Sequence, residues 1–252
     1  MSLSTPRGCR TLLGVSSLDL SIVIPAHNEA AIIRETTATV VDGLRKRPWT
    51  FEVIIVENGS SDDTATQANT LAAEYPEVQA RSRPHGDYGL ALREGFLRAR
   101  GAVVSNFDAD FYDLDFLDRA VPLVIDPAGP VIVVGTKRGA GSQDHRAIVR
   151  KVVTRTFSTL LRIAFGLQVS DTHGVKAMRH DALIGLVDDC KFGKDLFDTE
   201  LVLRAERAGL GTAELPVVVD EHRPPRESIL HRIPRAVIGL IRMRIQFWKE
   251  RI

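Results

Sequence analysis

The sequence predicts an α/β fold in which helices flank a mainly parallel central sheet. Short apolar runs of strand length alternate with segments whose apolar residues recur at helical spacing. This alternation is typical of right-handed crossovers between parallel strands. Several of the apolar runs also end abruptly in polar residues, and the carboxyl ends of strands in such sheets are where ligands bind. We therefore expect a functional site at one edge of the sheet.

The first half of the chain supplies most of the predicted sheet. Apolar runs predict buried strands at residues 18–25, 51–56, 78–82, 103–107 and 131–135. Helical spacing follows three of them, with apolar positions over residues 32–44, a second helix to Ala73 and a third over residues 88–100. Asn28 is expected to cap the first of these helices.

The second half is less regular. It predicts a basic helix over residues 144–165, a turn at 171–174, a strand at 175–178, a helix at 197–208 and a strand at 215–219. An amphipathic basic stretch, interrupted by Pro234, follows to the end. We divide the chain into a flexible leader (1–18), one domain (19–228) and a C-terminal helix (229–252).

Composition narrows the class of protein. The 252 residues are 44% hydrophobic and 26% charged, as in ordinary globular proteins, and the formal net charge is +1. No overall field therefore points to nucleic acid as a partner. No apolar run approaches the length needed to span a bilayer, and the leader does not resemble a secretory signal. Cys9 and Cys190 are far apart and lack metal-ligand spacing, which favours free thiols in a reducing compartment such as the cytoplasm, with a single disulfide as the alternative.

The strand at 103–107 runs directly into Asp108 and Asp110. Side chains two residues apart in an extended segment point the same way, so the two carboxylates can converge on one ion. Such hard oxygen ligands suit Mg²⁺ or Mn²⁺ completed by substrate phosphates. An isolated Asp-x-Asp is more often a solvated turn, and it is the surrounding sequence that favours the metal site.

Four blocks of sequence at the expected strand ends resemble the family 2 glycosyltransferases, and they occur in that family's order. They are Ser21–Glu29, Val56–Thr64, Gly89–Gly101 and the Asp108–Asp110 motif. A further set of blocks is similar to the polyprenyl-phosphate (dolichyl-phosphate) mannose and glucose synthases: residues 134–138, 171–174, 197–201 and 214–217. The resemblance covers about residues 19–230 and implies a GT-A fold.

The resemblance also implies a donor site for a nucleotide sugar, a GDP- or UDP-hexose, at the strand ends. The implied donor-binding residues are Pro25, His27, Glu29, Glu57, Gly59 and Asp108. Asp108 and Asp110 would hold Mg²⁺ or Mn²⁺ against the pyrophosphate, with Asp110 as a catalytic residue. On the donor side, His27 replaces the usual aromatic residue, and Glu57-Asn58 stands where two aspartates are common. Two further departures are Tyr112-Asp113, where a glutamine often follows the metal motif, and the altered stretch Arg223–Ile229.

Asp198 is the second implied catalytic residue. In many inverting relatives a carboxylate at this helix start is the general base for an acceptor hydroxyl. A phosphate acceptor is already ionised and needs no base, so here Asp198 could only position groups. The structural alternative is an acid that stabilises the helix N-terminus.

The acceptor side rests on basic residues that could clasp a lipid phosphate or simply face solvent. They are Lys137, Arg138, Arg146, Arg150 and Arg223. The stretch from Ile233 to Trp248 combines apolar and basic side chains, which suits a membrane interface, a helix packed on the core, or a second subunit in a homodimer.

We interpret the chain as a metal-dependent, inverting glycosyltransferase that acts on a polyprenyl phosphate, peripherally at the inner face of the cell membrane. One alternative is a soluble transferase for a small hydroxyl acceptor, with retention left open. The other is a catalytically silent subunit that binds nucleotide sugars.

Overall fold

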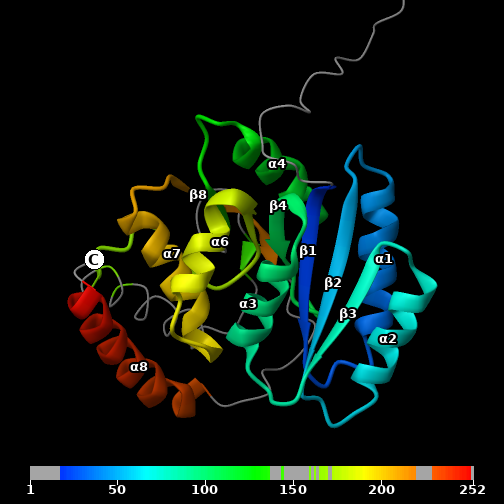
Figure 1. The fold of residues 1–252 in the computed structure, drawn as a ribbon, viewed down its shortest axis with the longest axis horizontal. Coiled ribbons are helices and arrows are strands. Elements are labelled where there is room, and N and C mark those ends of the chain that lie inside the picture. The colour runs from blue at the N-terminus through cyan, green and yellow to red at the C-terminus, as the bar shows by residue number, and fades with distance from the viewer. Residues whose placement is uncertain are drawn as a thin grey trace, which may run out of the picture.

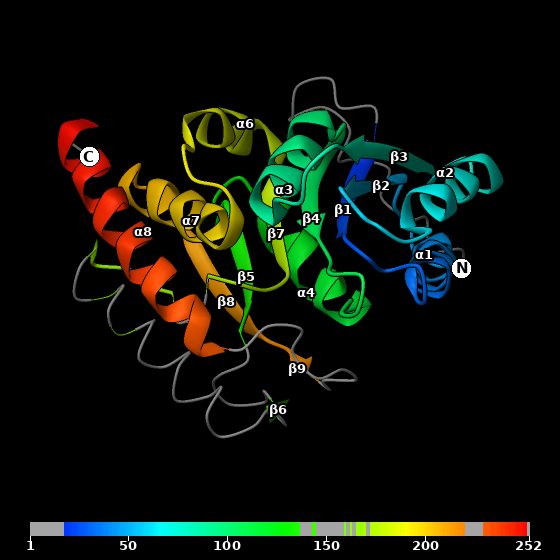
Figure 2. The same ribbon diagram turned by 90° about the horizontal axis from the view of Figure 1, so that it is seen from below.

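The computed structural model describes residues 18–136, 143–144, 159, 162, 165–169, 172–219 and 229–250. Seven strands form the main sheet: β1 (Leu18–Ala26), β2 (Phe51–Asn58), β3 (Val78–Arg83), β4 (Gly101–Asn106), β5 (Ile132–Thr136), β7 (Lys176–Arg179) and β8 (Thr212–Pro216). Their spatial order is β3-β2-β1-β4-β7-β5-β8 (all seven are labelled in Figure 2). The expected α/β architecture is confirmed.

Most neighbouring strands in this sheet are parallel. The exception is β7, which runs antiparallel to both β4 and β5. The register pairs Ala26 with Glu57 and Val23 with Asn106, so β1, β2 and β4 end at the same edge. Because β7 is reversed, its first residue, Lys176, pairs with Asn106 at this carboxyl edge. The reversed strand therefore adds a side chain to the edge where ligands bind in parallel sheets.

Helices cover both faces of the sheet. One face carries α1 (Ile33–Arg45), α2 (Thr64–Glu74) and α4 (Leu114–Ile125), and the other carries α3 (Tyr88–Arg98), α6 (His180–Asp189) and α7 (Phe197–Arg207), preceded by the short helix η1 (Lys194–Leu196) (Figures 1 and 2). Alternation along β1 shows why the two layers form. Ile22 and Ile24 pack toward α1, whereas Val23 packs toward α3.

The C-terminal helix α8 (Ile229–Glu250) lies alongside α7 (Figure 2). Its inner face buries Leu240, Met243 and Phe247 in the core cluster shared with α3 and α7. Arg204 of α7 joins the two helices, because its guanidinium contacts Glu200 (2.8 Å) and Glu250 (2.9 Å). Of the three environments predicted for this stretch, which were a membrane interface, the core and a second subunit, the structure shows packing on the core.

Two expectations about the second half need correction. The helix α8 is continuous through Pro234; a proline removes one backbone donor, and here the helix extends beyond it on both sides. Asp144 does not begin a helix but belongs to β6 (Gln143–Asp144), which pairs with β9 (Val218–Val219). Most of the predicted basic helix lies outside the described residues.

Within the described part of the chain, no helix is both long enough and apolar enough to cross a bilayer.

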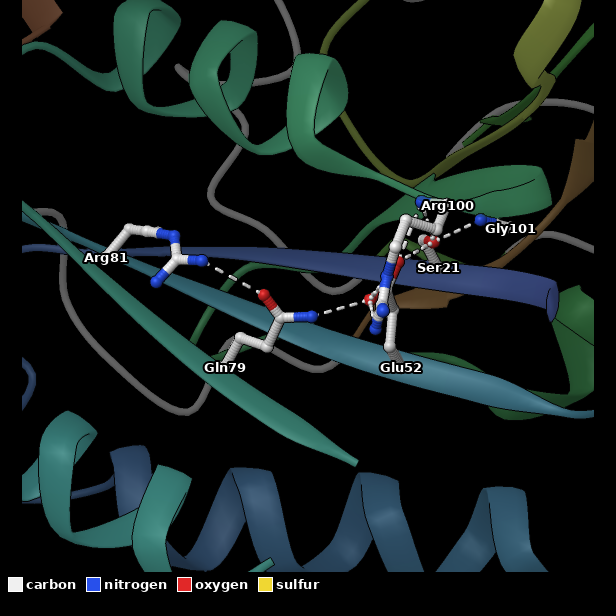
Figure 3. Close-up of polar contacts among 6 residues, drawn as sticks. All are labelled: Ser21, Glu52, Gln79, Arg81, Arg100 and Gly101. Atoms are coloured by element: carbon white, nitrogen blue, oxygen red, sulfur yellow. Dashed lines mark hydrogen bonds and ion pairs between the residues drawn. The ribbon is translucent and has the colours of Figure 1, made fainter. Parts of the chain in front are cut away.

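At the amino edge of the sheet, the buried carboxylate of Glu52 gathers donors from neighbouring strands (Figure 3). It accepts hydrogen bonds from Ser21 Oγ (2.7 Å), Gln79 Nε2 (2.8 Å), and the backbone N–H (2.7 Å) and guanidinium (2.6 Å) of Arg100. Ser21 Oγ in turn accepts from the N–H of Gly101 at 2.8 Å. The cluster therefore ties β1, β2 and β3 to the start of β4.

Replacing this carboxylate with an amide tests its contribution. Glu52→Gln keeps the shape but replaces charge-assisted bonds with neutral ones, so we expect the free energy of unfolding to fall by about 1.5–3 kcal/mol. The matched control is Glu74→Gln, which removes an exposed pair with Arg34 and should cost about 0–1 kcal/mol. Urea denaturation measures both. Equal losses would show that the Glu52 cluster does not hold the strands together.

Candidate active site

The loop after β1 is locked onto the turn after β2. The backbone of Asn28 is in the left-handed region (φ +56°) and its N–H donates to Ser60 Oγ at 3.0 Å. Its side-chain Oδ1 accepts from the N–H of Ser61 at 2.8 Å. Asn28 therefore does not cap α1, contrary to expectation, because its side chain is used to bind the neighbouring turn. The helix begins at Ile33 without a side-chain cap.

Three of the predicted donor-binding residues lie at the end of β1 and in the loop that follows it. Pro25 is buried and pairs with Val56 in the sheet. His27 is exposed, with Nδ1 2.7 Å from the carbonyl oxygen of Asn58. The N–H of Glu29 donates to Thr64 Oγ1 at 2.8 Å. The structure thus places Pro25, His27 and Glu29 together at the carboxyl edge of β1 and β2.

Glu57 and Gly59 shape the second half of this edge. The buried Glu57 accepts hydrogen bonds from the N–H of Ser60 (2.5 Å) and from Ser82 Oγ. Burial alone would raise the pKa of Glu57, but these hydrogen bonds bring it below its ordinary value, so the side chain stays ionised at neutral pH. Gly59 has φ +65°, and a Cβ there would lie 2.8 Å from the backbone nitrogen of Gly86. The turn therefore requires glycine.

Asp108 and Asp110 sit in a tight loop immediately after β4. The N–H of Asp108 donates to the carbonyl of Phe111 (3.0 Å), and the N–H of Phe111 donates back to Asp108 (3.2 Å). Thr36 Oγ1 donates to the carbonyl of Ala109 at 2.6 Å, which fixes the loop from α1. Asp108 is half-buried and Asp110 is exposed. The backbone thus presents both carboxylates beside the strand ends.

Tyr88, at the start of α3, reaches this loop from the other face of the sheet. Its hydroxyl donates to Asp108 Oδ1 at 2.8 Å. Burial, followed by the charges of Asp108 and Asp198, raises the pKa of Tyr88 well above its ordinary value. The phenol therefore remains a hydrogen-bond donor at neutral pH. The charge of Asp110 raises this pKa as well, so Asp108, Asp110 and Asp198 all act electrostatically on the hydroxyl.

Asp198 is the innermost of these carboxylates. It is 2% exposed, and Lys176 Nζ, itself fully buried, donates to its Oδ1 at 2.7 Å. Lys176 also donates to the carbonyl of Gly174 (2.9 Å), which accepts from Asn106 Nδ2 at 3.2 Å as well. Sequence reasoning missed Lys176. The available signal was a lysine inside a predicted buried strand, because such a charge needs a partner.

The residues around Tyr88 fit a divalent cation. Asp108, Asp110, Asp198 and Lys176 together carry a formal charge of minus two, which Mg²⁺ or Mn²⁺ would balance. Asp108 and Asp110 supply the carboxylate oxygens that both metals prefer, and donor phosphates could complete the shell. In the described ranges no three His, Cys, Asp or Glu side chains gather into a self-contained metal cage.

The predicted acceptor residues could not be placed. Lys137, Arg138, Arg146, Arg150 and Arg223 all lie outside the described residues. Their assignment to an acceptor phosphate stays a prediction.

Known proteins resemble this chain over the region that contains the sheet edge described above. The family model for glycosyl transferase family 2 matches residues 21–187. Glycosyltransferase AglD from Haloferax volcanii is 32% identical over 80% of this chain, and the chain spans about a third of AglD (33%). Dolichyl-phosphate beta-glucosyltransferase ALG5A from Trichomonas vaginalis is 27% identical over 96% of the chain and 79% of the relative.

A solved structure supports the fold. Glucosyl-3-phosphoglycerate synthase from Mycobacterium tuberculosis, in complex with Mn²⁺, UDP and glucosyl-3-phosphoglycerate, superposes with a TM-score of 0.67. Its sequence is 23% identical, and the match covers 90% of this chain and 80% of that one. At this identity the likeness concerns architecture, which confirms the expected GT-A fold.

The metal assignment predicts a specific loss. Asp110→Asn should abolish the Mn²⁺-dependent part of nucleoside diphosphate binding, and Asp108→Asn should weaken it less completely, because an amide is a poor substitute for a carboxylate ligand. Calorimetric titration of UDP and of GDP, with and without Mn²⁺, measures this. The control is Asp115→Asn, whose side chain is 93% exposed. Unchanged Mn²⁺-dependent affinity in Asp110→Asn would remove Asp110 from the metal site.

Proposed function

Because this chain belongs to glycosyl transferase family 2, we propose that it transfers a hexose from a GDP- or UDP-linked donor to a polyprenyl phosphate. The reaction uses Mg²⁺ or Mn²⁺ and inverts the anomeric carbon. It takes place at the cytoplasmic face of a membrane, to which the protein attaches peripherally.

The observation that carries the choice of acceptor is the buried pair of Asp198 and Lys176. A hydroxyl acceptor needs a general base that can take up its proton. If Asp198 took that proton, the buried Lys176 ammonium would lose its counter-charge, at a cost of several kcal/mol. Asp198 is therefore suited to be a fixed anion and poorly suited to be a base. A phosphate, which arrives ionised, matches such a site.

The proposed step is a single displacement. An oxygen of the acceptor phosphate bonds to the anomeric carbon, while the bond from that carbon to the donor phosphate oxygen breaks and its electron pair leaves with the nucleoside diphosphate. When bound, the metal offsets the charge that develops on this leaving group. Asp108 and Asp110 would hold that metal, and the edge formed by His27, Glu29 and Glu57 would bind the nucleoside.

Relatives support a lipid phosphate as the acceptor. Those from Trichomonas vaginalis and from Saccharomyces cerevisiae are named dolichyl-phosphate beta-glucosyltransferases, and the alignments span 79% and 66% of their lengths. Because AglD is matched over only a third of its length, it supports the family and adds nothing about the acceptor.

The outer face of α8 provides a surface for the membrane. Five large apolar side chains on it are exposed: Val237, Ile238, Ile241, Ile245 and Trp248. Exposed basic side chains accompany them: Arg242, Arg244 and Lys249. The opposite face is held on the core, so the helix can enter a bilayer surface without leaving the domain. Apolar side chains with basic neighbours are typical of helices that lie in an anionic lipid interface.

The role of Asp198 distinguishes a phosphate from a hydroxyl acceptor. Removal of a general base typically lowers kcat by roughly 10²–10⁴-fold. With a polyprenyl phosphate as the acceptor, Asp198→Asn should lower kcat by much less than this. Steady-state transfer assays measure this, and nucleotide titration confirms that the donor site is intact. If the single variant fails to fold, the double variant Asp198→Asn with Lys176→Met replaces it in the assay, because it removes both charges of the buried pair. A loss of about 10²-fold or more in a folded variant would favour the hydroxyl acceptor.

The α8 surface predicts binding to anionic vesicles. The unaltered protein should float with phosphatidylglycerol-containing vesicles at low salt and less at high salt. Ile241→Asp combined with Trp248→Asp should weaken vesicle binding about 100-fold or more, because each buried apolar side chain contributes on the order of 1.5–3 kcal/mol. Leu123→Asp, at an exposed apolar position on α4, is the control. No flotation at low salt would rule out this membrane surface.

A further inference from the structure

The function proposed above gives Tyr88 no role. Its side chain nevertheless connects α3 to the Asp108–Asp110 loop. Its hydroxyl lies 2.8 Å from Asp108 Oδ1. The tyrosine itself is half-buried. A residue in this position can orient a metal ligand without touching the metal.

The backbone around Tyr88 is held in place on both sides. Asp87 Oδ1 caps α3 by accepting from the N–H of Leu90 (2.9 Å), and it also accepts from the N–H of Lys194 in η1 (2.7 Å). Gly89 packs so closely on η1 and α7 that a Cβ would lie 2.6 Å from Cβ of Phe197 and 2.8 Å from the backbone of Gly193. The first turn of α3 therefore has little freedom to move relative to α7.

Asp108 is fixed through its backbone by Phe111. The hydrogen bond from Tyr88 binds Oδ1 of the Asp108 side chain and so restricts the orientation of the carboxylate. Partners that hydrogen-bond to metal ligands orient them, and losing such a partner typically weakens metal affinity about 10–100-fold. Tyr88 can orient Asp108 in this way, because its side chain is rigid and the start of α3 is held in place by Asp87 and Gly89.

We infer that Tyr88 is a positioning residue that orients the Asp108 carboxylate for the divalent cation and thereby sets the metal affinity of the site. The inference rests on the metal dependence in the proposed function, and it is independent of the acceptor. Tyr88 acts through Asp108 and makes no bond to the metal.

Tyr88→Phe removes the hydroxyl and keeps the ring. We expect the Kd for Mn²⁺, measured by electron paramagnetic resonance with saturating UDP or GDP, to rise about 10–100-fold. Metal-free nucleotide affinity and Tm should change little, which a merely structural role would not predict. Tyr75→Phe, at the end of α2, is the control for losing a tyrosine hydroxyl and should leave the Mn²⁺ affinity unchanged. In an Asp108→Asn background, Tyr88→Phe should cause no further loss.

An unchanged Mn²⁺ Kd in Tyr88→Phe would overturn the inference. An equal loss in the Asp108→Asn background would also overturn it, because Tyr88 would then act through another group. If the unaltered protein binds no Mn²⁺ with either nucleotide, both this inference and the proposed metal dependence fail. If the Mn²⁺ effect is found but no polyprenyl phosphate is glycosylated, the inference holds and the proposed acceptor is wrong.

Discussion

The buried ion pair between Lys176 and Asp198 is the constraint on which the site depends. Its 2.7 Å contact joins β7 to the first turn of α7 where neither side chain reaches solvent. Removing one partner of such a pair costs about 3–5 kcal/mol, because the other charge stays buried. The pair therefore demands that the start of β7, which pairs with Asn106, lie within side-chain reach of the first turn of α7. The reversed direction of β7 in an otherwise parallel sheet meets this demand.

The rest of the site is assembled around that pair. The start of α3 packs against η1 and the start of α7 through Asp87 and Gly89. This packing positions Tyr88 beside the Asp108–Asp110 loop. The other end of α7 holds α8 through Arg204. One helix thus contacts both the carboxylate cluster and the helix that we propose to enter the lipid surface. A lipid acceptor would bring its phosphate and its hydrocarbon to neighbouring parts of one protein, and α7 connects the carboxylate cluster to the helix that carries the proposed lipid surface.

Prediction from sequence succeeded where the signal is local. Apolar runs and helical spacing identified β1, β2 and β4, and the polar residues at their ends are at one edge because parallel strands end together. It failed where the cause is a distant contact. Nothing near Lys176 in the chain announces a partner 22 residues away, and nothing near Asn28 shows that its side chain binds Ser61 instead of capping α1. The helices α4 and α6 were not anticipated, and the acceptor residues between 137 and 150 lie outside the described ranges.

The central claim is that Asp198, paired with Lys176, does not act as a base, and that the enzyme therefore takes an acceptor that is already ionised. The most direct measurement compares a short polyprenyl phosphate with the polyprenol of the same length as acceptors, using the unaltered protein, Mn²⁺ and a panel of GDP- and UDP-hexoses. The account predicts that sugar is transferred to the phosphate and not to the alcohol. Transfer to the alcohol at a comparable kcat/KM would contradict it, because Asp198 or another group would then have to accept the hydroxyl proton.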